Sequence, residues 1–254
     1  MEYDTLPSAV GSHLKLDEVF EVLELYRKHG PETVKERVLR DNIFDYNTTN
    51  ARNRVLTSVR RSFLSFNSKV RKRSFLETIS ALDEKAKREV LFYRLCRRSY
   101  TSYRITLKVF VPAYNDGIEF LKKEKVIEFL KRKKETTKSV EKWTESTINT
   151  VGSKYLTTMK KFGYLSGRQK KKINYFSPEL ESVTYAIYEL LDRDKTPKKI
   201  INSDRLKLFM LQKRDILNYL ERIGSTGYIK FGRAGDLYEI HPMARFEELH
   251  NAIK

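Results

Sequence analysis

The chain has 254 residues, of which 40% are hydrophobic and 12% aromatic, a composition that supports a buried core. Its formal net charge is +18 and its isoelectric point is about 9.8, which predicts a polyanionic partner. No apolar run approaches the roughly 20 residues that span a bilayer, and the first residues lack a signal-peptide pattern, so we expect a cytoplasmic protein with no membrane partner.

The first part of the chain is predicted to be helical. Apolar residues recur at helical spacing over 17–29, and Gly30-Pro31 ends that helix and begins another. After the turn-forming sequence DYNTTN, we expect helices over about 50–66, 74–82 and 84–111, the last with a break near Ser99. Pro112 and the sequence NDG at 115–117 mark the first expected domain boundary.

The rest of the chain contains two segments in which helices precede a hairpin. Residues 117–139 are helical and strongly charged, and a helix over about 145–162 precedes two short strands around Gly167. Beyond Pro178 we expect further helices, one of them over 205–223, and the alternation over 227–241 predicts a hairpin. The prediction is a mainly α, multi-helix protein with helix-turn-helix or winged-helix-like modules and one or two short β-hairpins. The expected domains are 1–112, 113–178 and 179–254.

The strongest functional signal is the distribution of charge over residues 142–176, which contain one carboxylate, Glu145. The apolar residues of the expected helix share one face, and the opposite face carries only short polar or cationic side chains. An ordinary exposed helix usually mixes the two signs of charge. Helix, helix and basic hairpin is the order of a winged helix, whose second helix enters the major groove while the hairpin contacts phosphate. The predicted DNA-binding residues here are Ser146, Thr147, Thr150, Lys154, Thr157, Lys160, Lys161, Arg168, Lys170, Lys171 and Lys172. A solvated helix followed by a basic loop is the alternative interpretation.

A second block without carboxylates runs from residue 46 to residue 76. Its helix places Asn and Arg side chains on one outward stripe, and these side chains pair well with adenine and guanine edges. Arg52 falls toward the apolar side, which favours a structural role. The predicted DNA-binding residues of this block are Asn50, Arg54, Thr57, Arg61, Arg71, Lys72 and Arg73. Ordinary bundle helices with arginines extended over their surface are the alternative. The hairpin near the C-terminus mixes both signs of charge, which favours a packing or partner role.

The sequence offers little for catalysis or metal binding. Cys96 is the single cysteine, which excludes an intramolecular disulfide and a thiolate zinc site. The four histidines share no ligand spacing, and no phosphate-binding loop, dinucleotide fingerprint or nucleophile elbow occurs. We therefore expect a non-enzymatic protein without catalytic residues, metal or cofactor.

Four segments together resemble the BrxA family of bacteriophage exclusion (BREX) defence systems. They are LELYRKHGPETVKERVLRDNIF, NARNRVLTSVRRSFL, KWTESTINTVGSKYLTTMKKFGYL and DRLKLFMLQKRDILNYLERIGSTGYIKFGRAGDLYEI. The resemblance implies a mainly helical, non-enzymatic component that binds double-stranded DNA through helix-turn-helix elements. It also implies that a methyltransferase, an alkaline-phosphatase-like protein and an ATPase are encoded nearby, which makes them candidate partners. The expected hairpins at 164–176 and 227–241 depart from an all-helical description.

Two other functions stay open at this stage. The first is an RNA-binding regulator similar to NusB, which would use exposed aromatic side chains as stacking platforms for single-stranded bases. The second is an adaptor within the defence complex, whose basic faces would contact acidic protein surfaces.

Overall fold

The computed structural model describes residues 2–4, 15–193 and 196–253. The chain divides into two compact units, one formed by Met1–Ser65 with Arg94–Tyr175 and the other by Phe66–Tyr93 with Phe176–Lys254. The division falls inside helix α4 (Glu84–Arg98). The three domains expected from the sequence, 1–112, 113–178 and 179–254, stay a prediction.

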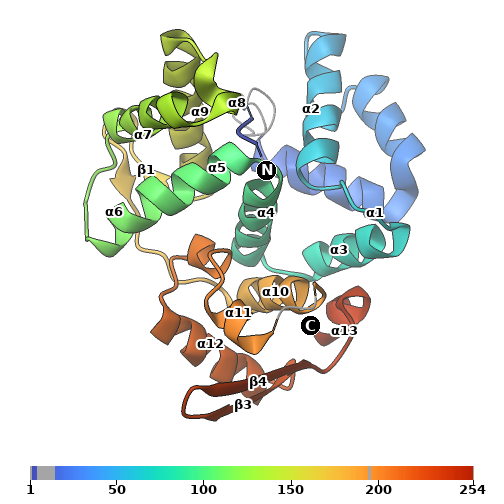
Figure 1. Cartoon of the computed structure of the whole chain (residues 1–254). Helices are drawn as coiled ribbons and strands as arrows, with labels where there is room; N and C mark the ends of the chain where they lie inside the picture. The colour runs from blue at the N-terminus through green and yellow to red at the C-terminus, as the bar shows by residue number, and fades with distance from the viewer. Residues whose placement is uncertain (1, 5–14, 194–195, 254) are drawn as a thin grey trace. The chain divides into compact units, whose positions relative to one another are not determined.

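The first unit consists mainly of helices (Figure 1). A π-helical turn at Thr106–Phe110 joins two of them, α5 and α6, and a small antiparallel hairpin follows the last helix. The helices are α1 (Leu16–Leu39), α2 (Thr49–Ser62), α5 (Tyr100–Ile105), α6 (Val111–Asn115), α7 (Lys123–Thr136), α8 (Lys138–Glu141) and α9 (Glu145–Lys161), and the strands are β1 (Leu165–Ser166) and β2 (Lys172–Ile173).

Two breaks expected from the sequence are confirmed in this unit. Gly30 has φ 78° and ψ −177°, so α1 is kinked there before Pro31. Ser99 separates α4 from α5, and its hydroxyl accepts a hydrogen bond from the Ser102 amide N–H at 3.2 Å. The structural role of Arg52 is also confirmed, because its guanidinium donates to the Leu39 carbonyl at 2.7 Å and ties α2 to the end of α1.

The second unit combines helices with a longer hairpin. Its helices are α3 (Lys69–Ala81), α10 (Leu180–Leu191), α11 (Pro197–Ile201), α12 (Lys213–Ser225) and α13 (Leu249–Ala252), and its strands are β3 (Ile229–Ala234) and β4 (Leu237–Pro242). The antiparallel register runs from Ile229 opposite Pro242 to Ala234 opposite Leu237. The expected helix over 205–223 is wrong in its first part, because a 3₁₀ turn at Leu206–Phe209 ends in Met210 with φ 59°. A left-handed residue cannot continue a helix.

The core of the second unit forms around α10. Every residue from 182 to 190 is buried, as expected for a helix that is apolar on most of its surface. The Tyr185 ring lies 6.2 Å from Phe75, 6.3 Å from Tyr93 and 5.6 Å from Phe246, all as edge contacts between ring centroids. Such contacts are favourable for aromatic pairs. The predicted mainly α class with small antiparallel hairpins is therefore confirmed.

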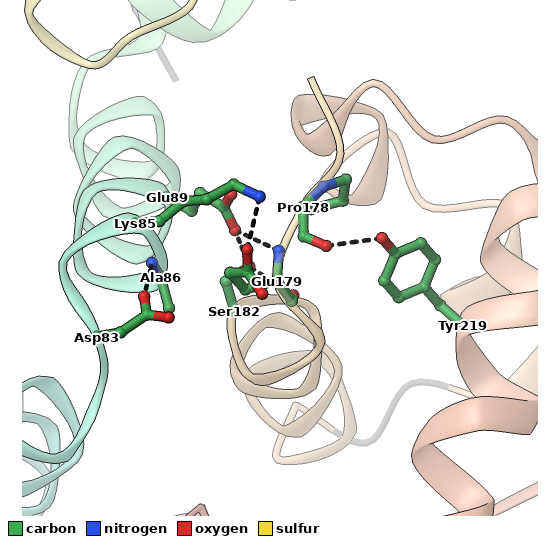
Figure 2. Close-up of polar contacts among 8 residues, drawn as sticks. All are labelled: Asp83, Lys85, Ala86, Glu89, Pro178, Glu179, Ser182 and Tyr219. Atoms are coloured by element: carbon green, nitrogen blue, oxygen red, sulfur yellow. Dashed lines mark hydrogen bonds and ion pairs between the residues drawn. The ribbon is translucent and has the colours of Figure 1, made fainter. Parts of the chain in front are cut away.

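A buried carboxylate holds the start of α10 (Figure 2). Glu89 of α4 accepts hydrogen bonds through Oε2 from the Glu179 amide N–H at 2.8 Å and from the Ser182 hydroxyl. Lys85 pairs with Glu179 at 2.5 Å, and Tyr219 of α12 donates to the Pro178 carbonyl at 2.7 Å. Because Glu179 is the N-cap residue, Glu89 satisfies a helix-terminal N–H that the helix itself leaves unpaired.

Burial raises the pKa of Glu89 to about 7, against the opposing effects of the Ser182 and Glu179 hydrogen bonds and the Lys85 charge. The folded state therefore retains a proton that the unfolded chain loses near pH 4.5. Since the folded state binds more protons in this window, this group's contribution to stability is present below pH 4.5 and is lost as the pH rises through about 7.

We predict that Glu89→Gln, which keeps the acceptor oxygen but cannot ionise, removes this loss of stability. Relative to wild type, the variant should gain on the order of 3 kcal/mol between acidic pH and pH 8, measured by chemical unfolding across that range. Glu84→Gln, at an exposed position on the same helix, is the matched control and should follow the wild-type pH profile. Parallel profiles for Glu89→Gln and wild type would contradict the assignment.

Candidate nucleic-acid interface

Helix α9 begins and ends where the sequence predicts. Thr144 is the N-cap, and its hydroxyl accepts from the Thr147 amide N–H at 3.1 Å, as expected for a helix start. Glu145 lies in the first turn, where the helix dipole favours a negative charge. The helix ends before Gly163, which has φ 85°.

Two contacts fix the rotation of α9 about its axis. Gly152 faces α7, and a Cβ atom there would lie 3.5 Å from Ile127, so the two helices pack closely. The buried Tyr155 hydroxyl lies 3.0 Å from Thr106 Oγ1 in the π-helical turn. Trp143, just before the helix, is only 5% exposed and anchors this end of the helix in the core.

Because the buried face is fixed, the opposite face of α9 points to solvent. Seven residues of α9 are exposed, two of which are Glu145 and Asn149 near its start. The other five form a stripe with hydroxyl side chains along most of its length and a lysine in the last turn: Ser146, Thr150, Ser153, Thr157 and Lys160. Thr147 is partly buried and shares a hydroxyl contact of 3.0 Å with Thr144. The stripe carries no carboxylate, as the sequence indicates.

The two remaining lysines of α9 lie at one edge of this stripe. Lys154 and Lys161 are both partly buried. Burial lowers the pKa of Lys161, while the charge of Glu18 in α1 raises it and that of Lys15 lowers it. The pKa of Lys161 therefore depends on charges at the start of α1. The proposed contact surface does not include Lys161.

The hairpin that follows α9 is basic and tightly turned. Gly167 has φ 83°, and a Cβ atom there would lie 2.2 Å from the Lys170 carbonyl oxygen, so only glycine fits. The Lys171 ammonium group donates to the Arg168 carbonyl at 2.5 Å and to the Gly167 carbonyl at 3.3 Å, which closes the loop. Arg168, Lys170 and Lys172 are exposed.

A short extended segment pairs with the other side of this hairpin. Phe120 forms an antiparallel bridge with Lys172, the Leu121 amide N–H donates to the Lys171 carbonyl at 2.8 Å, and the Ile173 amide N–H donates to the Glu119 carbonyl at 2.8 Å. Residues 119–121 therefore act as a third strand beside β2. They bring the start of α7 next to the basic loop.

The region from residue 119 to residue 175 concentrates positive charge. It contains sixteen lysines and arginines against six carboxylates. Glu145 is paired with Lys131 of α7 at 2.8 Å, and Glu119 lies 3.8 Å from Lys172. The single carboxylate of α9 is therefore neutralised by the protein itself.

The other predicted stripe lies on α2. Asn50, Arg54, Thr57 and Arg61 are all exposed and recur at helical spacing, while Val55, Leu56 and Val59 are buried on the opposite side. Helix α2 packs on α1, where the Tyr46 hydroxyl donates to Glu18 at 2.7 Å. This stripe is thus presented by a different helix from the α9 surface.

The last three predicted residues are in α3, which belongs to the second unit. Arg71 donates hydrogen bonds to Asp192 at 2.7 Å and to Glu247 at 3.2 Å. Both carboxylates are distant from Arg71 in the sequence but belong to the same unit. Lys72 is partly buried and Arg73 is exposed. The structure gives Arg71 an internal role, and we leave it out of the proposed interface.

A family model for BrxA matches residues 2–187, which cover α1 to α9, the first hairpin and most of α10. The chain belongs to the BrxA family. It is accordingly a component of a BREX defence system. A comparison with curated proteins found no match to this chain.

Sequence reasoning missed part of the surface of this BrxA-family protein. Lys122 and Lys123 lie next to the basic hairpin because residues 119–121 pair with β2. The helix expected over 117–139 is wrong in its first part, because α7 begins only at Lys123 and residues 119–121 pair with the hairpin instead. This paired segment is too short for an alternating pattern to reveal it. The only available signal was the sequence FLKK directly after the turn NDG.

Within residues 2–4, 15–193 and 196–253, no group of three or more His, Cys, Asp or Glu side chains gathers as a metal site would require. In the same described part of the chain, no helix combines the length and apolarity that crossing a bilayer demands.

The ion pairs of Arg71 predict a stabilising role. Arg71→Ala should lower the free energy of unfolding by about 1–3 kcal/mol, because it leaves two partly buried carboxylates without their partner. Urea unfolding measures the change. Arg73→Ala, two residues away and exposed, should change it by no more than about 0.5 kcal/mol. Equal effects of the two substitutions would refute the assignment.

Proposed function

We propose that this BrxA-family protein binds double-stranded DNA without catalysing a reaction on it, with α9 in the major groove and the β1–β2 hairpin on the phosphate backbone. The observation that carries the proposal is the carboxylate-free stripe of α9 beside an exposed basic loop. A carboxylate on this face would oppose phosphate in the complex. Binding is mostly electrostatic, because phosphate contacts supply affinity and few side chains reach base edges.

The order of elements supports a winged-helix-like arrangement in this part of the chain. Helices α5 and α6 are followed by the paired segment 119–121, then by α7, the four-residue α8, α9 and the β1–β2 hairpin. In this interpretation α9 is the recognition helix and the hairpin is the wing. Short side chains such as Ser146 and Thr150 allow close approach to base edges, while Lys160 and Arg168 are placed for the backbone.

The stripe on α2 is a second proposed contact. Arg54 and Asn50 have the side chains that pair bidentately with guanine and adenine, and their exposure leaves them available. Lys72 and Arg73 of α3 are kept as weaker candidates for phosphate contacts. Such multiple contacts suit a component that positions DNA for other BREX proteins, and the methyltransferase, the alkaline-phosphatase-like protein and the ATPase are the proposed partners.

The first test is duplex binding by a Lys160→Glu/Arg168→Glu variant. With about 6 phosphate contacts, the wild-type logarithm of affinity should fall with the logarithm of salt concentration at a slope of roughly −5. The variant should bind at least about tenfold more weakly, with a slope shallower by about 2. Fluorescence anisotropy measures both quantities.

The matched control for this test is Lys198→Glu/Lys199→Glu, which makes the same change in charge at two exposed positions of α11. This control variant should bind the duplex more tightly than the Lys160→Glu/Arg168→Glu variant does. A flat salt dependence for wild type, or equal losses in the two variants, would remove the proposed interface.

The same assay separates the alternatives left open by the sequence. Preference for single-stranded RNA over duplex DNA at matched salt would favour a NusB-like RNA-binding regulator. Capture of other BREX components after nuclease treatment, with no effect of the Lys160→Glu/Arg168→Glu changes, would favour an adaptor.

The α2 stripe makes a separate prediction. Arg54→Ala should weaken duplex binding and reduce the steepness of the salt dependence by about 1, because one charged contact is lost. Lys35→Ala removes an exposed lysine of α1 and serves as the control. If Arg54→Ala binds as wild type does, the α2 stripe is an ordinary solvent-exposed helix face.

A further inference from the structure

A groove with a volume of about 730 Å³ lies beside the exposed stripe of α9. Three elements form it: the segment 120–124 at the start of α7, the side of α9 around Ser153 and Thr157, and the loop 169–171 of the hairpin. All three belong to the first unit. Its volume falls within the roughly 300–1,000 Å³ that is typical of small-ligand sites.

One wall of the groove is aromatic. Phe120 is 36% exposed, although its neighbour Leu121 is buried and its own backbone pairs with Lys172. Alternation along a strand explains why one ring points out while the next side chain points in. The Lys170 ammonium group lies 5.9 Å from the centre of the Phe120 ring. A ring face is thus held next to a cation.

The charged side chains of the groove are mostly cationic. Lys122, Lys123, Lys170 and Lys171 line it, against a single carboxylate, Glu124. Lys122 is the N-cap of α7 and makes no side-chain capping bond within the described chain, so the positive end of the helix dipole adds to the lysine charges. Ser153, Thr157 and Gln169 supply hydrogen-bonding groups.

We infer that this groove binds one unpaired nucleotide of a DNA strand, with its base stacked on Phe120 and its phosphate on the surrounding lysines. The inference rests on the proposed duplex binding and names an additional feature of the ligand. A base inside a duplex is stacked on both faces and has none free for an aromatic ring, and a groove for phosphate alone would not require an aromatic wall. Aromatic rings beside cations are the usual means of holding single-stranded bases.

The test compares a blunt duplex with a duplex that carries a short single-stranded tail, the two containing equal numbers of phosphates. Wild type should bind the tailed duplex roughly fivefold or more tightly, the range expected from stacking one base. Phe120→Ala should abolish this preference and leave the affinity for the blunt duplex unchanged, whereas Phe120→Tyr should retain it. Ile118→Ala, a change at an exposed apolar residue two positions away, should also retain it.

Each other outcome overturns a defined claim. If wild type binds tailed and blunt duplexes equally, the nucleotide site is refuted while duplex binding stands. If Phe120→Ala weakens both ligands equally, Phe120 is a general contact or a packing residue, and the site is refuted as well. If neither ligand binds, the proposed duplex binding itself fails.

Discussion

The burial of one face of α9 decides what the first unit presents to solvent. Ile148, Tyr155 and Met159 are fully buried, and the Tyr155–Thr106 contact and the close approach at Gly152 leave no freedom to rotate the helix. Successive residues are separated by about 100° around a helix axis. A shift of one residue would therefore turn Lys160 toward the core, where an unpaired ammonium group is costly. The polar stripe is thus a consequence of the packing behind it.

Some cations with a structural role are held by carboxylates that lie far from them in the sequence. Arg71 is held by Asp192 and Glu247, although no carboxylate lies near it in the sequence. Glu145 forms an ion pair with Lys131. At the exposed end of α9 and in the loop of the hairpin, Lys160 and Arg168 remain at the surface. The surrounding region has a large excess of positive charge. This exposed positive charge distinguishes the surface of α9 and the hairpin, which is suited to a polyanion, from places where cations are held in ion pairs within the protein.

Local patterns in the sequence predicted most of the elements, and distant contacts account for what they missed. The Thr144 cap, the break at Ser99 and both hairpins follow from residue types within a few positions of one another. The left-handed conformation of Met210 is set by packing, because methionine has no preference for it. The pairing of Phe120 with Lys172 joins residues far apart in the chain, and it creates the groove that spacing alone could not indicate.

The second unit shows that a similar order of elements does not suffice for the proposed function. Helix α12 also precedes a hairpin, but Arg222 lies over the Tyr219 ring at 5.0 Å and Arg233 over the Tyr238 ring at 5.9 Å, while carboxylates alternate with cations in both elements. The chain thus contains two helix–hairpin segments with different surface chemistry. Since function depends on surface groups more than on backbone order, the α9 segment is the one of these two segments that we propose as a DNA contact. The match to the BrxA family covers residues 2–187, which include α9 and its hairpin and end before α12.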